Sequence, residues 1–142
     1  MAYINATMRQ CVRAAFADRC AYCQCSQNHV PGKLEIEHIH PESRGGTNEE
    51  INLCLACRSC NLSKSDRVEA TDPLTQENIS LFNPRTQNWN EHFQWSPDGA
   101  RILGKTPTGR ATIIALSLNN ELAVTVRCEW VRVGWHPPQD QT

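Results

Sequence analysis

The sequence predicts an α+β protein whose N-terminal part is stabilised by a bound zinc ion. Two Cys-x-x-Cys pairs, Cys20/Cys23 and Cys57/Cys60, enclose a segment in which strand, loop and strand patterns follow one another. The second pair lies where a short helix pattern begins. After about residue 70 the pattern changes to short strands and two helical stretches. We therefore expect a zinc-containing domain at residues 1–70 and a small α+β extension at residues 71–142.

Composition narrows the class of protein. The net charge is −1, so the chain lacks the global basic charge of many nucleic-acid binders. Contacts with DNA would have to come from a local cluster of cations: Arg44, Arg58, Lys64 and Arg67. No apolar run is long enough to predict a membrane span, and no signal-peptide pattern opens the chain. With eight cysteines in a protein expected in the cytoplasm, paired thiols predict metal ligands in preference to disulfides.

The first expected element is a helix over residues 7–18, capped by Asn5 or Thr7. Apolar residues recur at the spacing of one helix face: Met8, Cys11, Val12, Ala15 and Phe16. We expect this helix to pack over the zinc site, with its arginines away from the apolar face.

The next elements form a hairpin followed by a helix. Pro31-Gly32 predicts a turn, and residues 34–39 then alternate as a strand does. Residues 41–48 have the proline, glycine and asparagine content of a loop. Alternation returns at residues 51–55, and residues 59–67 suit a short helix that would place Asn61 and Lys64 on one face.

The C-terminal half predicts another hairpin and two helices. Ser96-Pro97-Asp98-Gly99 suits a type I turn between two short strands. Thr106-Pro107 is typical of a helix start. Residues 120–133 fit either a strand or a helix, and we favour the helix. Trp89, Phe93 and Trp95 could stack on bases, but an aromatic core is the preferred interpretation.

The two thiol pairs carry the clearest metal signal. Tetrahedral zinc takes four thiolates about 2.3 Å away, and Cys-x-x-Cys lets one tight turn supply two of them. The predicted ligands are Cys20, Cys23, Cys57 and Cys60. Cys54-x-x-Cys57 is a second possible pair, and Cys25 also lies close in sequence. Four thiolates leave no open position, so this zinc would be structural. We expect Cys11 and Cys128 to be small buried apolar residues.

The segment between the thiol pairs resembles the HNH endonuclease family and its ββα-metal motif. The matching stretch is EHIHPESRGGTNEEINLCLACRSCNLSK, within residues 20–67. His38 would be the first letter of the family's name, Asn52 the central asparagine, and Asn61 the final position. The resemblance implies metal-dependent cleavage of DNA, with Mg²⁺ or Mn²⁺ as the catalytic ion.

The resemblance also implies roles for individual residues. His38 would act as the base, while Glu37 and Asn61 would hold the catalytic ion and Asn52 would fix His38 or the loop. Neighbouring side chains in a strand point to opposite faces. The strand is therefore expected to end or bulge near Glu37 and His38. Expected phosphate contacts are the cations that follow along the chain: Arg44, Lys64 and Arg67.

Several alternatives stay open at this point. A non-catalytic zinc-stabilised module that binds nucleic acid would keep the four cysteines without needing His38, Glu37 and Asn61 together. RNA is a possible substrate, because such a site contacts phosphate and not bases. The sequence indicates no membrane association and no obligate protein partner. One active site per chain predicts nicking by a monomer.

Overall fold

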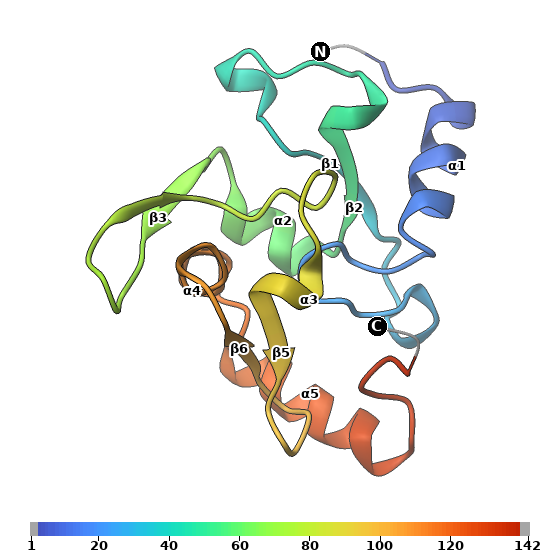
Figure 1. Cartoon of the computed structure of the whole chain (residues 1–142). Helices are drawn as coiled ribbons and strands as arrows, with labels where there is room; N and C mark the ends of the chain where they lie inside the picture. Colours follow the sequence, from blue (N-terminus) through green and yellow to red (C-terminus); the bar gives the residue numbers. More distant parts are fainter. Residues whose placement is uncertain (1–2, 140–142) are drawn as a thin grey trace. The chain divides into compact units, whose positions relative to one another are not determined.

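The structure, a computed structural model, describes residues 3–139 and divides into two compact units (Figure 1). The first unit holds the residues up to Val68 together with Asn83–Thr86. The second holds Glu69–Phe82 and the residues from Gln87 onward. The first long stretch thus ends at Val68, and the second unit begins at Glu69. The return of Asn83–Thr86 to the first unit has no signal in the sequence.

In the first unit a two-stranded antiparallel sheet lies between two helices. Strand β1 (Glu35–His38) pairs with β2 (Leu53–Ala56), with Glu37 opposite Cys54 and His38 opposite Leu53. Helix α1 (Ala6–Ala15) packs against β2, and α2 (Arg58–Lys64) packs against β1. All four residues of β2 are buried, so β2 is the centre of this unit.

Local signals fix the ends of these elements. Asn5 caps α1 by accepting a hydrogen bond from the amide of Met8 at 2.9 Å. Short 3₁₀ turns lie at Gln27–His29, Glu42–Arg44 and Glu50–Asn52. The first thiol turn is tied to the sheet by a 2.7 Å hydrogen bond from the amide of Ala21 to the carbonyl oxygen of Leu55.

The segment Asn83–Thr86 supplies one long side chain to the first unit. Arg85 donates to the carbonyl oxygen of Leu53 at 2.8 Å, and its guanidinium lies 5.0 Å from the centre of the Phe16 ring. The guanidinium of Arg85 also lies 3.6 Å from a carboxylate oxygen of Glu50. These contacts explain why the segment belongs to the first unit.

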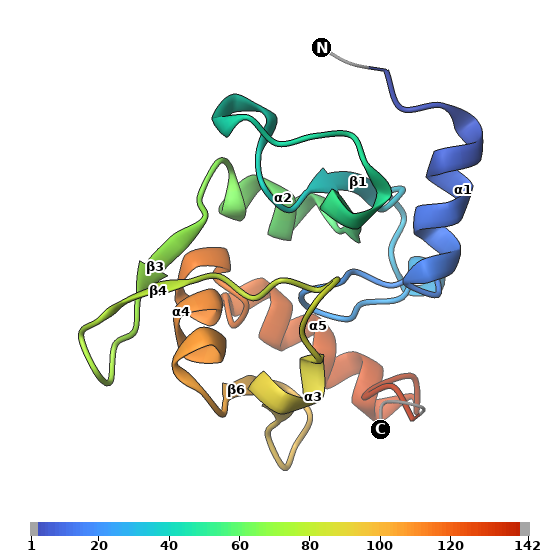
Figure 2. The same cartoon turned by 45° about the horizontal axis from the view of Figure 1, so that its top comes forward.

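The second unit combines two hairpins and three helices. Its elements are β3 (Glu69–Thr71), β4 (Asn78–Ser80), α3 (Trp89–His92), β5 (Phe93–Trp95), β6 (Ile102–Gly104), α4 (Pro107–Leu116) and α5 (Glu121–Arg132). The β3–β4 hairpin packs beside α4 (Figure 2). The predicted turn joins β5 to β6, Thr106 caps α4, and residues 121–132 are helical. The β3–β4 hairpin and α3 were not predicted.

Apolar and aromatic residues fill the core of the second unit. Trp89 and Phe93 are buried with ring centres 5.2 Å apart, and Phe82 meets Phe93 edge to face. The expected aromatic core is therefore present. Buried Arg127 donates to the carbonyl oxygens of Ala100 and Leu118, and Arg127 thereby joins α5 to two loops. Within residues 3–139 no helix has the length and apolar character needed to cross a bilayer.

Candidate metal centre and catalytic site

Four cysteines converge where the first thiol turn meets the start of α2. The sulfur atoms of Cys20, Cys23, Cys57 and Cys60 all lie within 4.8 Å of one another. Cys23 and Cys57 place their sulfurs 3.7 Å apart. Tetrahedral zinc with bonds of about 2.3 Å requires sulfur separations of about 3.8 Å. The donor set and its spacing therefore fit zinc, and Cys57 also caps α2 by accepting from the amide of Cys60.

The structure decides which cysteines make up this centre. Cys54 points away from it and donates to Tyr22 and Glu37 at 3.7 and 3.5 Å. Burial and the Glu37 carboxylate raise the pKa of the Cys54 thiol, which suits a protonated donor and not a metal ligand. The alternative Cys54/Cys57 pair is therefore excluded. Cys11 and Cys128 are exposed, so the expectation that they are buried is wrong. Both lie on helices that cover the core with other residues.

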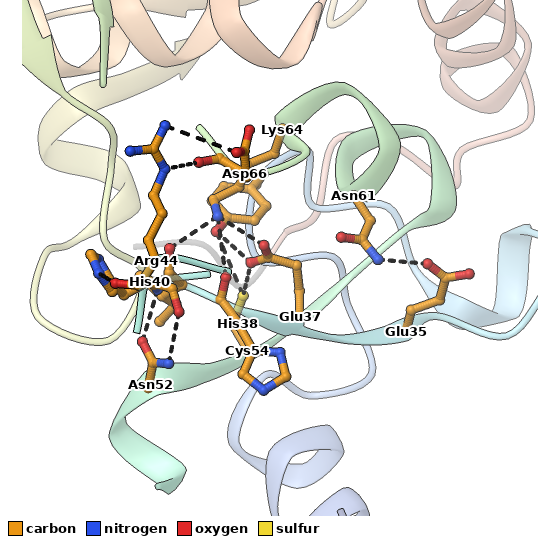
Figure 3. Close-up of polar contacts among 12 residues, drawn as sticks. Glu35, Glu37, His38, His40, Arg44, Asn52, Cys54, Asn61, Lys64 and Asp66 are labelled. Atoms are coloured by element: carbon orange, nitrogen blue, oxygen red, sulfur yellow. Dashed lines mark hydrogen bonds and ion pairs between the residues drawn. The ribbon is translucent and has the colours of Figure 1, made fainter. Parts of the chain in front are cut away.

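Glu37 lies at the buried centre of a polar cluster between β1, β2 and α2 (Figure 3). One carboxylate oxygen accepts from Lys64 at 2.9 Å, and the other accepts from Tyr22 at 3.0 Å and from Cys54. Burial, Cys54 and the carboxylate raise the pKa of the Tyr22 hydroxyl, so that it keeps the proton it donates. This arrangement leaves about one of the four acceptor sites of the carboxylate unfilled.

Lys64 differs from its expected placement. Its side chain is 1% exposed, and the ammonium also donates to the carbonyl oxygens of His38 and Ile39 at 3.2 and 3.0 Å. The expectation that Lys64 contacts phosphate is therefore corrected, because its ammonium is buried and fully hydrogen-bonded. Lys64 shares the face of α2 that packs against β1, and its three donors are all used there. In this arrangement it does not face a phosphate in solvent.

Asn61, one turn before Lys64, makes a separate contact with the same strand. Its amide nitrogen donates to Glu35 at 2.8 Å, and Arg58 lies 3.3 Å from the other oxygen of that carboxylate. Within the described part of the chain, no hydrogen bond reaches the amide oxygen of Asn61. Glu35 and Glu37 both point toward α2, because alternate residues of a strand share a face. The predicted ligands of the catalytic ion, Glu37 and Asn61, thus lie on the side of β1 that faces α2.

His38 points the other way, and Figure 3 shows its ring directed away from Glu37. β1 ends at His38 in regular register, so the strand ends as expected and contains no bulge. The Nε2 atom of His38 lies 2.6 Å from Oδ1 of Asn48 and 3.7 Å from a carboxylate oxygen of Glu42. Its side chain is 17% exposed.

Asn52 holds the loop between β1 and β2 through three side-chain hydrogen bonds. Its oxygen accepts from the amide of His40 at 2.8 Å, and its nitrogen donates to the carbonyl oxygens of His40 and Thr47 at 3.0 and 2.8 Å. A side chain at Gly46 would overlap the carbonyl oxygen of His40, so the loop turns where only glycine fits. Asn52 thus holds the loop backbone and does not touch the His38 ring.

The remaining predicted residues lie at the surface. Arg44 is exposed and donates to the carbonyl oxygen of Asp66 at 2.6 Å, which links the loop to the end of α2. Arg67 is exposed a few residues later. Sequence reasoning missed Glu35, Asn48 and Tyr22. The alternation of β1 could have placed Glu35 beside Glu37, whereas a loop residue such as Asn48 carries no periodic signal.

A family model matches part of the chain. Residues 20–67 match the family model described as HNH endonuclease. This stretch contains both thiol pairs, the β1–β2 hairpin and α2. The α+β class and the four-cysteine centre expected from the sequence are therefore confirmed. No curated protein and no solved structure matches the chain.

Proposed function

We propose that the protein is a metal-dependent endonuclease that hydrolyses DNA phosphodiester bonds. The observation that carries this proposal is the HNH family match over residues 20–67, which contain His38, Asn52 and Asn61 on a hairpin and the following helix. The four-cysteine centre supports it, because a zinc ion there would fix the start of α2 against the hairpin.

His38 is the proposed base. Its imidazole takes a proton from a water molecule as the water oxygen attacks phosphorus. The bond from phosphorus to the 3′ oxygen then breaks, and that oxygen takes a proton from a solvent water and leaves as a hydroxyl group. The products carry 5′-phosphate and 3′-hydroxyl ends. Asn52 supports this step by holding the loop that follows His38.

Glu37 and Asn61 are the proposed ligands of a catalytic Mg²⁺ or Mn²⁺. The donors fit a hard divalent ion, because the amide oxygen of Asn61 has no partner in the described residues and the Glu37 carboxylate keeps one acceptor site. When bound, such an ion would neutralise charge on the phosphate and on the departing oxygen. Lys64, bonded to Glu37, holds that carboxylate in one position.

The opposite directions of Glu37 and His38 suit this chemistry. In an in-line displacement, the attacking and the departing oxygens lie on opposite sides of phosphorus. A base on one face of the strand end and the carboxylate on the other can therefore serve the two oxygens of one reaction. This arrangement removes the need for a bulge in β1.

Binding of DNA is proposed to be weak and to rest on local charge. Arg44 and Arg67 are the proposed phosphate contacts, since both are exposed. A chain with one active site would nick duplex DNA as a monomer, in the cytoplasm where its thiols stay reduced. RNA is the alternative substrate, because none of these groups reads a base.

One observation favours a second candidate, a non-catalytic zinc-stabilised module that binds nucleic acid. Glu37 is buried and already bonded to Lys64, Tyr22 and Cys54, as a purely structural carboxylate would be. Such a module would bind DNA without a divalent ion and would not cut it.

An end-labelled DNA duplex distinguishes the two candidates. The zinc-loaded protein is incubated with the duplex, or with an end-labelled RNA, in Mg²⁺, in Mn²⁺ or in EDTA, and binding and cleavage are measured side by side. An endonuclease cuts only with the ion and leaves 5′-phosphate ends. Binding that is equal in all three buffers, with no cleavage of DNA or RNA, would instead favour the module.

A further inference from the structure

The ring of His38 is held at one nitrogen by a side chain from the loop. Nε2 lies 2.6 Å from Oδ1 of Asn48, and a carboxylate oxygen of Glu42 is 3.7 Å from the same nitrogen. A carboxylate can only accept hydrogen bonds. Two oxygen atoms therefore face Nε2, and both favour a hydrogen atom on it.

A neutral imidazole carries one hydrogen, so a hydrogen on Nε2 leaves the lone pair on Nδ1. We propose that Asn48 is a positioning residue that fixes the Nε2–H form of His38 and thereby makes Nδ1 the atom that takes the proton from water. This inference rests on the proposed nuclease function. It adds a residue and an atom that the family match alone does not assign.

The fold anchors the loop immediately before Asn48. Asn52 clasps the loop backbone at His40 and Thr47, immediately before Asn48. The tight passage at Gly46 fixes the path of the same loop. Asn52 thus acts on His38 only indirectly. Its three hydrogen bonds fix the loop, and the loop positions Asn48 beside the His38 ring.

A purely structural role explains the contact less well. Asn48 is partly exposed and lies outside the strands and helices, so its side chain is not part of the packed core. Within residues 3–139 its side-chain oxygen contacts the His38 ring. A side-chain amide oxygen that accepts a hydrogen bond from a histidine ring fixes the orientation of that ring, as the partners of other catalytic histidines do.

The test measures two quantities separately: which nitrogen of the His38 ring carries the hydrogen atom, and the rate of DNA cleavage. Histidine labelled with ¹⁵N reports the hydrogen-bearing nitrogen of His38 by NMR at alkaline pH, where imidazole is neutral. His38→Gln identifies the signal. Single-turnover cleavage of the labelled duplex is measured on the same protein samples. The variants are Asn48→Ala, Asn48→Asp, which keeps an acceptor oxygen, and exposed Glu49→Ala as the control.

The proposal expects Nε2–H in the wild type, a mixture of both forms in Asn48→Ala, and a fall in cleavage rate of about 10- to 100-fold. Asn48→Asp should restore the Nε2–H form and most of the rate, and Glu49→Ala should resemble the wild type. Hydrogen on Nδ1 in the wild type, or an Asn48→Ala variant unchanged in both readouts, would overturn the proposal. If the wild type cuts nothing, the nuclease function fails, while the NMR result still decides whether Asn48 sets the form of His38.

Discussion

Replacing Lys64 by methionine tests the buried polar cluster that joins α2 to β1. The ammonium is 1% exposed and bonded to Glu37 and two backbone carbonyl oxygens, and the partner carboxylate is 4% exposed. Lys64→Met keeps most of the side-chain volume but leaves an uncompensated buried charge. Breaking such a pair costs about 3–5 kcal/mol of folding free energy. A folded domain has only about 5–15 kcal/mol to lose, so the variant should be close to unfolding.

The double variant Lys64→Met with Glu37→Gln separates charge from packing. It removes both charges while the glutamine can still accept from Tyr22. Its cost should be smaller than that of Lys64→Met alone by about 1–3 kcal/mol. All four tryptophans lie in the second unit, so their fluorescence would miss this effect. Hydrogen exchange of the β1 and β2 amides in the zinc-loaded protein is the suitable assay. A cost below about 1 kcal/mol for Lys64→Met would refute the reasoning.

Three further predictions concern zinc, the second unit and the ion site. Cys60→Ser should release zinc and unfold the first unit, whereas Cys128→Ser should retain one zinc ion per chain by metal analysis. The Arg110 guanidinium holds the pKa of the Asp72 carboxyl well below its usual range. The stability from this pair is complete above about pH 4 and is lost as the pH falls through the lowered pKa. Asp72→Asn should therefore be less stable at neutral pH and lose less on acidification, as measured by urea unfolding. Glu35→Ala should weaken Mn²⁺ binding about 10-fold by calorimetry, because the Glu35 carboxylate accepts from the side-chain amide of Asn61 and orients it. Unchanged affinity would show that Glu35 does not support the ion site.

Much of the first unit could be predicted because its signals are local. The Cys-x-x-Cys spacing predicts a four-thiolate zinc centre without any knowledge of the fold, although only the structure excludes the alternative pair Cys54/Cys57. Alternation identifies β1 and β2, and Pro31-Gly32 and the glycine-rich loop mark their ends. In the second unit, Thr106-Pro107 correctly predicts the start of α4 for the same reason: a cap depends on a few adjacent residues.

The failures concern partners that are distant in the sequence. Lys64 was expected to contact phosphate, but the proximity of Glu37, a distant partner in the sequence, makes its burial favourable. Cys11 fits the apolar face of α1 by spacing, yet in α1 only Val12 is buried. Asn48 lies in a loop, where no periodicity indicates that its side chain contacts His38.

Conversion of supercoiled plasmid to the nicked form is the most direct test of the central claim. Wild type and His38→Ala are compared in Mg²⁺, Mn²⁺ and EDTA, with equal zinc content verified for both proteins. We predict nicking by the wild type that requires the divalent ion, and a loss of about 100- to 10,000-fold in His38→Ala. Nicking that survives in His38→Ala, or that continues in EDTA, would contradict the assignment of His38 as the base of a metal-dependent nuclease.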